Sequence, residues 1–185
     1  MSYRILGPKG NPIVRSAPAA RVKAILPALK RRFAPGRITV LDNTPAPVSL
    51  RDKVVELARK GVANEPKIHY AETRPMPLAW KLPLTTDCSG FATLCYKLAG
   101  APDPNGLSYN GTGYTGTLIG RGKPVRRPQP GDLVFYGPGA AFHVAIVVEA
   151  GPDPLTVSHG QEAGPQYCRV SQDNRQPVRF RSYLP

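Results

Sequence analysis

Residues 86–100 read Thr-Asp-Cys-Ser-Gly-Phe-Ala-Thr-Leu-Cys-Tyr-Lys-Leu-Ala-Gly. This stretch predicts a helix that begins at Cys88, because Thr86 or Asp87 can cap its first turn and Gly100 can end it. Four apolar side chains recur at helical spacing and should pack inward: Phe91, Leu94, Cys95 and Leu98. Cys88 is therefore expected at a helix N-terminus, where unpaired backbone N–H groups and the positive end of the helix dipole favour a thiolate.

A second helix is predicted upstream of this one. Ser49 followed by Asp52 has the form of a capping box, and an apolar stripe continues from there to Gly61, a residue type that often ends helices. The helix should cover about residues 50–60.

Beyond residue 130 the composition changes from helical to β. β-branched and aromatic residues gather in four runs that Gly and Pro turns separate, at residues 133–136, 142–149, 155–159 and 178–184. Helices first and sequential antiparallel strands afterwards predict an α+β domain over residues 48–185, in which N-terminal helices pack on a small antiparallel β-sheet. Between helix and strands, residues 101–122 contain six glycines, which predicts a long loop with a binding role.

Residues 1–47 are interpreted as an extension of this domain. Apolar residues recur at helical spacing between Val22 and Phe33, but Pro27 lies among them and would break an interior hydrogen bond. Residues 1–67 hold fourteen Lys and Arg against four acids, which gives +10 of the formal net charge of +13. Such a surface can attract nucleic acid or an anionic cell envelope, or it can be a solvated face.

Cysteine usage and hydropathy limit the class of protein. Cys88, Cys95 and Cys168 are an odd number without a C-x-x-C pair, which argues against a disulfide framework and a structural zinc site. The N-terminus lacks the apolar run of a secretory signal, and no later run approaches the ~20 apolar residues of a membrane span. We therefore expect a soluble protein that is made in the cytoplasm.

Two histidines can complete a cysteine site. Alternation along the second predicted strand places His143 on the same face as Ala145, whose small side chain leaves room for a helix. If the hairpin that follows pairs Glu149 with Leu155, His159 falls opposite Ala145 and on the face of His143. The two imidazoles would then be neighbours.

A cysteine nucleophile needs a base, and the base needs a polar group that fixes its orientation. Cys88, His143 and His159 can fill these three roles in that order. The simpler alternative is that both histidines are polar residues with backbone partners and that Cys88 is a small buried apolar residue. His69, in a polar loop, is assigned to that alternative.

Four segments together resemble the NlpC-type cell-wall cysteine peptidases, a family with a papain-like fold. The segments follow the order and spacing of that family: Asp87-Cys88-Ser89-Gly90-Phe91, Pro130-Gly131-Asp132-Leu133-Val134-Phe135-Tyr136, His143-Val144-Ala145-Ile146 and Val157-Ser158-His159-Gly160. The resemblance spans residues 68–160. Residues 109–116 and 158–165 further resemble the peptidase modules of endolysins from phages of actinobacteria, whereas residues 1–47 match no family.

The resemblance implies hydrolysis of peptide bonds in the stem peptides of peptidoglycan, commonly the bond between D-glutamate and a diamino acid. It gives the roles above to Cys88, His143 and His159, makes Asp132 structural, and requires no metal or organic cofactor. Three residues would line the substrate groove: Tyr70, Asp87 and Ser89. The chain departs from the family after Tyr70, because the aromatic residue and two glycines expected there are absent and the gap to the cysteine is longer.

An enzyme of this kind would act on the bacterial cell wall, and its basic N-terminal third could hold it on an anionic envelope polymer. Other functions fit the same residues. A papain-like cysteine site can also act as an amidase or acyltransferase, and a basic module with an inert Cys88 could bind cell wall or nucleic acid without catalysis. Zinc binding through Cys88, Cys95 and a histidine is a further alternative, although the seven-residue cysteine spacing fits zinc sites poorly.

Overall fold

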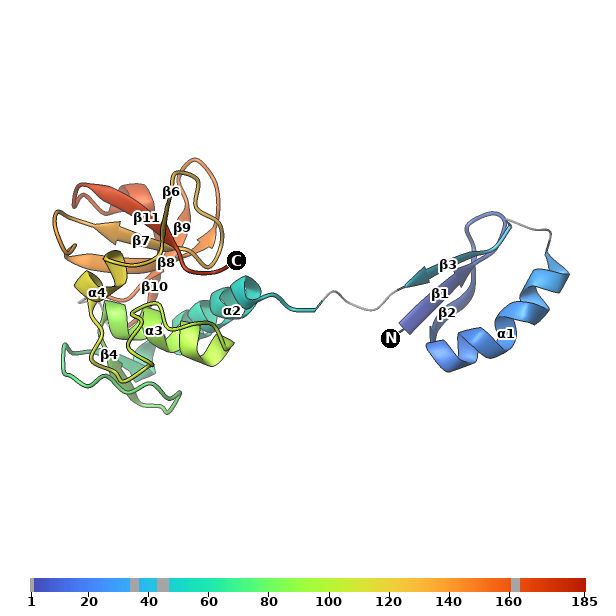
Figure 1. Ribbon diagram of the computed structural model, residues 1–185, viewed down its shortest axis with the longest axis horizontal. Helices are drawn as coiled ribbons and strands as arrows, with labels where there is room; N and C mark the ends of the chain where they lie inside the picture. Colours follow the sequence, from blue (N-terminus) through green and yellow to red (C-terminus); the bar gives the residue numbers. More distant parts are fainter. Residues whose placement is uncertain (1, 34–36, 43–46, 161–163) are drawn as a thin grey trace. The chain divides into compact units, whose positions relative to one another are not determined.

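The computed structural model describes residues 2–33, 37–42, 47–160 and 164–185. The chain divides into two compact units, Met1–Pro47 and Val48–Pro185, and both contain helices and strands (Figure 1). No helix in the described part of the chain combines the length and the apolar character that crossing a bilayer requires.

The N-terminal unit is a three-stranded antiparallel sheet with one helix. Its strands are β1 (Ser2–Leu6), β2 (Pro12–Pro18) and β3 (Thr39–Asp42), in the order β2-β1-β3, and α1 covers Ala19–Arg32. Ile5, Ala17 and Val22 form the buried core between sheet and helix. Helix α1 contains the apolar residues that recur at helical spacing and runs through Pro27. This proline lies on the exposed side of the helix, where water can bind the carbonyl that loses its intrahelical partner.

In the C-terminal unit, both predicted helices are confirmed. Helix α2 (Leu50–Ala63) begins with the capping box of Ser49 and Asp52, and α3 (Cys88–Ala99) is capped by Asp87 and ends at Gly100, whose φ is 75°. The prediction that α2 ends at Gly61 is wrong. A Cβ at Gly61 would lie 2.4 Å from Cζ of Phe91, so the glycine allows close approach of α2 and α3 instead.

A six-stranded antiparallel sheet forms the other layer, in the order β10-β9-β8-β7-β11-β6. Its strands are β6 (Lys123–Val125), β7 (Leu133–Tyr136), β8 (His143–Glu149), β9 (Leu155–Ser158), β10 (Gln166–Arg169) and β11 (Val178–Ser182). The four predicted strands correspond to β7, β8, β9 and β11, and the α+β class is confirmed. The short strands β6 and β10, at the two edges, were not predicted.

Shorter elements connect these layers. They are β4 (Ile68–Tyr70) and β5 (Leu84–Thr86), which pair in parallel, the short helix α4 (Thr115–Ile119), and the single 3-10 turns η1 (Glu65–Lys67) and η2 (Val170–Gln172). Strand β5 leads directly into α3. Helix α4 lies within the segment 101–122 that was predicted to be a loop.

The helices cover the face of the sheet that we did not expect. Val144, Ile146 and Val148 of β8 belong to the main core with α2 and α3, whereas Ala145 and Val147 pack in a smaller cluster on the other face. Figure 1 shows α2 and α3 together on one side of the sheet. The small side chain of Ala145 therefore does not mark the helix side, because the three larger apolar side chains of β8 bury more surface against the helices.

Arg51 fastens the start of α2 to the sheet and to the C-terminus. Its Nη1 donates to Oδ1 of Asp132 at 2.8 Å and to the carbonyl of Pro130 at 3.0 Å. Its Nη2 donates to Oγ of Ser182 at 2.9 Å, and its Nε donates to the carbonyl of Pro185 at 3.0 Å. The carboxylate of Asp132, at the start of β7, is buried and thus forms an ion pair inside the fold.

Candidate active site

The sulfur of Cys88 lies at the start of α3, close to the first residues of β8. Its neighbours include the backbone N–H of Val144 and the hydroxyl of Thr115, both of which lower the pKa of the thiol by hydrogen bonding, and Oγ1 of Thr115 is 4.0 Å from Sγ. Val144 directly follows His143. Cys88 therefore lies at the end of β8 at which His143, the first residue of this strand, is also located.

The Cys88 thiol is nevertheless harder to ionise than the helix position suggested. Burial, followed by the negative charge of Asp87, raises its pKa to about 11, and the donors around the sulfur only partly offset this. The backbone N–H groups at the helix start do lower the pKa of the thiol, but loss of hydration raises it by more. At neutral pH the free thiol is protonated, so any nucleophilic role depends on a base.

His143, which directly precedes Val144, is the candidate for that base, and its ring is fixed on two sides. Its Nε2 lies 2.8 Å from Oγ of Ser158, and its ring stacks on Tyr136 with 5.8 Å between ring centroids and an angle of 29°. The imidazole is 3% exposed. With Nε2 directed at Ser158, Nδ1 is the ring nitrogen that can take a proton from a cysteine.

The predicted register that would place His159 opposite Ala145 is wrong. Glu149 does pair with Leu155, as expected, but the register shifts by one residue between Val147 and Glu149. Ala145 consequently pairs with Ser158 instead of His159. A one-residue shift exchanges the two faces of a strand, so Ser158 takes the place beside His143 that was predicted for His159.

His159 contacts the segment that leads into the cysteine. Its Nε2 lies 3.0 Å from the carbonyl oxygen of Thr86, the last residue of β5. Its ring packs edge-on against Tyr70 at 5.5 Å and Phe91 at 5.8 Å between centroids. The imidazole is thus buried beneath the start of α3, and its role as the orienting residue remains a prediction.

A cavity of about 300 Å³ opens beside Cys88. All three residues predicted to line a substrate groove border it: Tyr70, Asp87 and Ser89. Its other wall includes Thr112, Tyr114 and Thr115 of the predicted binding loop. Residues 161–163 of the segment 158–165 lie outside the described residues.

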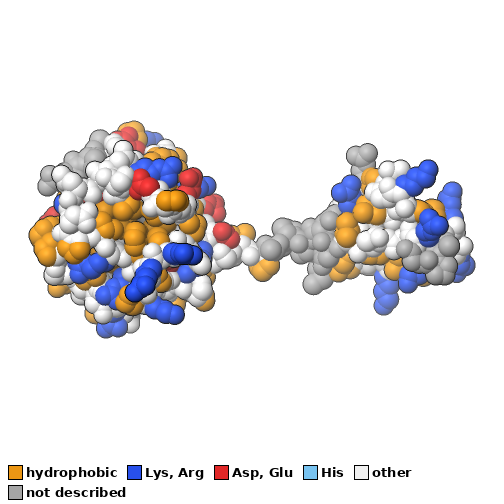
Figure 2. Space-filling model, turned by 90° about the horizontal axis from the view of Figure 1, so that it is seen from above, with side chains coloured by type: hydrophobic (Ala, Val, Ile, Leu, Met, Phe, Trp, Pro, Cys, Tyr) orange, Lys and Arg blue, Asp and Glu red, His pale blue; other side chains and the backbone are white. Residues whose placement is uncertain are grey.

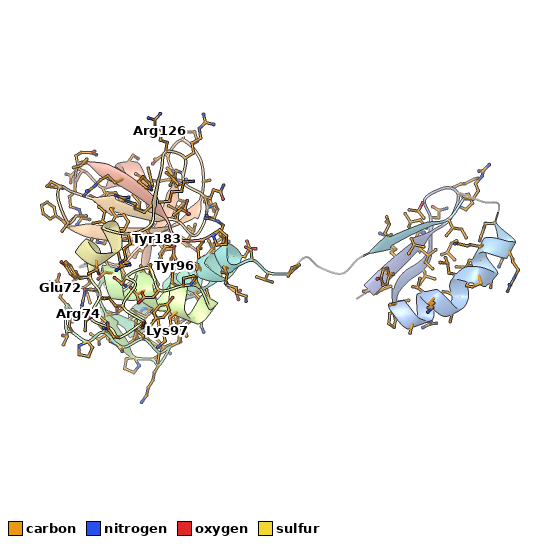
Figure 3. All side chains as sticks on the ribbon, viewed as in Figure 1. Glu72, Arg74, Tyr96, Lys97, Arg126 and Tyr183 are labelled. Carbon is orange, nitrogen blue, oxygen red and sulfur yellow. The ribbon has the colours of Figure 1, made fainter. Side chains whose placement is uncertain are left out.

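Arg74 is a groove residue that the sequence analysis missed. Its Nη2 donates to Oδ2 of Asp87 at 2.7 Å and to Oγ of Ser89 at 3.0 Å, and its Nε donates to the carbonyl of Gly113 at 3.0 Å. In Figure 3, Arg74 and Glu72 lie at the same edge of the unit. Arg74 lies in an irregular proline-containing segment, so no helical or strand pattern indicates its position. The sequence could suggest it only because a buried Asp87 carboxylate needs a cation as partner.

The hydrogen bonds of Asp87 give it a structural role beside its place in the groove. Its Oδ1 accepts from the backbone N–H of Gly90 at 2.6 Å and from Oγ of Ser89 at 2.9 Å, while Oδ2 faces Arg74. Tyr70 donates its hydroxyl to Oε1 of Glu72 at 2.8 Å, and burial, then this hydrogen bond, raises the pKa of the phenol. The groove thus presents a protonated phenol and a guanidinium beside the cysteine.

Comparison with known protein families gives one match, the NlpC/P60 family, over residues 74–172. This segment is more than half of the chain and contains both Cys88 and His143. The chain belongs to the NlpC/P60 family. The match begins after Tyr70, so it does not cover the residue at which the sequence departs from the pattern of this family.

Comparison with solved structures gives matches of low sequence identity. The peptidoglycan hydrolase RipB from Mycobacterium tuberculosis is 19% identical over 73% of this chain and 67% of its own, with a TM-score of 0.47. RipD from the same organism, described as a non-catalytic NlpC/p60 domain protein adapted to peptidoglycan binding, is 21% identical over 73% of this chain and 98% of its own, with a TM-score of 0.49. The P60 domain of an antigen from M. avium paratuberculosis is 19% identical over 72% and 98%, with a TM-score of 0.41. A comparison with curated proteins finds no match.

Proposed function

We propose that this NlpC/P60 protein is a cysteine peptidase that hydrolyses peptide bonds in the stem peptides of peptidoglycan. The observation that carries the proposal is the position of the Cys88 sulfur, at a helix start and within reach of the N–H group that follows His143. The sulfur borders an open cavity large enough for a peptide segment. Family membership supplies the substrate class, peptidoglycan.

In the proposed mechanism, His143 accepts the proton of the Cys88 thiol as the sulfur attacks the substrate carbonyl. Backbone N–H groups at the start of α3 stabilise the negative charge that develops on the carbonyl oxygen. The C–N bond then breaks, His143 returns the proton to the departing amine, and a thioester remains on Cys88. Water, deprotonated by His143, attacks the thioester and releases the carboxylic acid and the thiol.

The raised pKa of Cys88 bears on this sequence of steps. Burial raises the pKa of the Cys88 thiol, so in the proposed sequence His143 takes the proton of the thiol as the sulfur attacks. Tyr70 and the Arg74 guanidinium, held by Asp87 and Ser89, would contact the substrate next to the scissile bond. On the resemblance drawn above, that bond is the one between D-glutamate and the diamino acid.

The test is digestion of purified cell-wall material by the wild type, by Cys88→Ala and by the control Cys168→Ala. Cys168 lies on β10 and does not border the cavity, so its loss should leave the activity unchanged. We expect a newly exposed amine, identified by mass spectrometry, in the wild-type and Cys168→Ala digests only. Equal release by Cys88→Ala would refute a cysteine mechanism.

One observation favours a second candidate, a module that binds peptidoglycan without cutting it. Cys88 is 5% exposed, and burial raises the pKa of its thiol, as expected for a packing cysteine. In that case wild type and Cys88→Ala would bind wall material equally and neither would release an amine. An amidase or acyltransferase on the same residues would be recognised by different muropeptide products.

The finer biological role that we propose is that of a phage endolysin. It rests on the resemblance of residues 109–116 and 158–165 to such enzymes and on the basic N-terminal unit, whose residues 1–47 hold nine Lys and Arg against one acid. Figure 2 shows Lys and Arg side chains distributed over this unit. The unit would hold the enzyme on an anionic polymer of the cell envelope.

A further inference from the structure

The contact between His143 and Ser158 is fixed by the fold. The register shift between β8 and β9 places Ser158 opposite Ala145, and from there its Oγ reaches Nε2 of His143 at 2.8 Å. Both side chains are buried, with 3% and 9% of their surfaces exposed. Water cannot easily replace either partner, so this hydrogen bond sets the orientation of the ring.

We propose that Ser158, through its hydroxyl group, is the positioning residue that orients His143. The sequence analysis had given this role to His159. The inference rests on the proposed function, in which His143 is the base. If Nε2 carries the proton and donates it to Oγ of Ser158, the lone pair of the neutral ring is on Nδ1, where the cysteine proton is taken up. The ring keeps this bond when it becomes an imidazolium, because Nε2 is protonated in both states.

The groups around His143 are compatible with a neutral orienting residue. On β7, Tyr136 stacks on the imidazole, and the guanidinium of Arg175 lies 5.8 Å from the centre of the same phenol ring. Asp173 forms an ion pair with Arg175 and also interacts electrostatically with His143. Positive charge that develops on His143 therefore has a carboxylate in its neighbourhood, so the orienting residue itself does not need to be charged.

His159 has a different task in this arrangement. Its hydrogen bond to the carbonyl of Thr86 and its ring contacts to Tyr70 and Phe91 support the β5 strand and the start of α3. Loss of His159 should therefore loosen the cysteine segment, whereas loss of Ser158 should release the His143 ring. The two residues are adjacent in sequence and can be separated by their effects.

The experiment compares Ser158→Ala, Ser158→Thr and His159→Gln in the full-length chain, each with the background substitution Cys168→Ser. Two properties are measured without any wall substrate: the tautomer of His143 by ¹⁵N NMR, assigned with His143→Gln, and the rate of Cys88 alkylation by iodoacetamide between pH 5 and 10. Unfolding by urea reports the stability of each variant. Hydrolysis of stem peptides is measured in parallel.

We expect Ser158→Ala to lose the Nε2–H preference of His143 and to slow alkylation at pH 7 by about tenfold, the effect of losing one buried hydrogen bond. Ser158→Thr keeps the hydroxyl and should restore both properties. His159→Gln should lower the urea midpoint and leave the tautomer unchanged. Should Ser158→Ala not fold, Ser158→Cys, which keeps the volume and weakens the acceptor, is expected to show the same losses.

An unchanged tautomer and alkylation profile in Ser158→Ala, or their loss in His159→Gln alone, would overturn the proposal. Neither readout depends on peptidoglycan. A wild type that alkylates normally but releases no amine from the wall would therefore count against the proposed function and leave the role of Ser158 intact.

Discussion

At the scale of single residues, the chemistry of the site depends on a balance of hydration and proton transfer at Cys88. Burial raises the pKa of the thiol to about 11, and the adjacent carboxylate of Asp87 acts in the same direction. Near pH 7 only about 10⁻⁴ of such a thiol would be ionised. For Cys88 to act as the proposed nucleophile, the imidazole of His143 has to take the proton.

This gives a prediction for His143→Ala. In the wild type, alkylation of Cys88 by iodoacetamide should already be fast near pH 7, because His143 accepts the proton. In His143→Ala the rate at pH 7 should fall by about 100-fold and recover only as the pH rises towards about 11, where the thiol ionises unaided. The measurement is mass spectrometry of Cys88 in a Cys168→Ser background.

Cys95 provides an internal reference for that experiment, because it is fully buried and burial raises the pKa of its thiol as well. It should remain unmodified in both proteins while they are folded. Superimposable pH profiles of Cys88 in wild type and His143→Ala would remove His143 from the mechanism.

A second prediction at this scale concerns Arg74. The guanidinium joins Asp87, Ser89 and the carbonyl of Gly113, and thereby connects the start of α3 with the loop across the cavity. Arg74→Gln should lower kcat/KM for stem peptides by about 10- to 100-fold, since a buried carboxylate loses its charged partner. Steady-state kinetics on a defined stem peptide measures this.

Lys81 also borders an irregular segment before α3 but lines a different cavity, so Lys81→Gln is the matched control and should retain wild-type kinetics. If Arg74→Gln and Lys81→Gln were equally active, the Arg74 contacts would be irrelevant to catalysis.

At the scale of elements, the site exists because α2 and α3 are held against one face of the sheet. Gly61 and Phe91 allow the two helices to approach closely, and Arg51 attaches the start of α2 to β7 and to the C-terminal residues. The Pro130-Gly131-Asp132 segment of the family pattern contributes the buried carboxylate of that attachment. Asp132 is therefore structural, as the family resemblance implied.

The ion pair of Arg51 and Asp132 leads to a prediction about stability. Arg51→Ala removes the cation and leaves the Asp132 carboxylate buried, which should lower the free energy of unfolding by about 3 kcal/mol. Arg59→Ala is the control, because Arg59 lies 3.7 Å from Glu149 with about half of each side chain exposed. That exposed pair should contribute less than about 0.5 kcal/mol.

Urea denaturation of both variants, followed by circular dichroism, compares them directly. A loss in Arg51→Ala no larger than in Arg59→Ala would mean that the Arg51 contacts do not stabilise the fold.

At the scale of the whole molecule, the candidate active site and a cluster of consecutive cations lie in different units. The groove, the cysteine and both buried histidines belong to the unit Val48–Pro185, whereas the last turn of α1 in the other unit carries the consecutive cations Lys30, Arg31 and Arg32. All three are exposed. This division predicts that wall attachment and bond cleavage respond to different substitutions.

Replacing Lys30, Arg31 and Arg32 together by Gln should weaken binding to anionic wall material by about tenfold at low salt and flatten its dependence on salt. Hydrolysis of a soluble stem peptide should be unaffected. The control is Arg126→Gln with Arg127→Gln, which removes two cations from the other unit; both border a different cavity from that of Cys88. Co-sedimentation with purified cell walls from 50 to 500 mM salt, a range over which screening becomes strong, is the measurement.

Wall binding that is unchanged in the triple variant, or insensitive to salt in the wild type, would contradict an electrostatic role of the N-terminal unit. Loss of soluble-peptide hydrolysis in the triple variant would contradict the separation of the two tasks.

The sequence by itself predicted α2, α3 and four strands of the larger sheet, and it indicated Cys88 and His143 as the candidate reactive pair. Caps, Gly100 and an apolar stripe are local signals, and they placed Cys88 at the start of a helix; alternation and turns placed His143 on a strand. Tertiary structure decided which side chains contact His143 and which line the cavity beside Cys88. A one-residue shift between β8 and β9 selected Ser158 over His159, and the fold brought Arg74 to Asp87 across 13 positions. Both depend on how separate elements pack, and alternation along β8 gives no sign of the irregularity between Val147 and Glu149 that shifts the register.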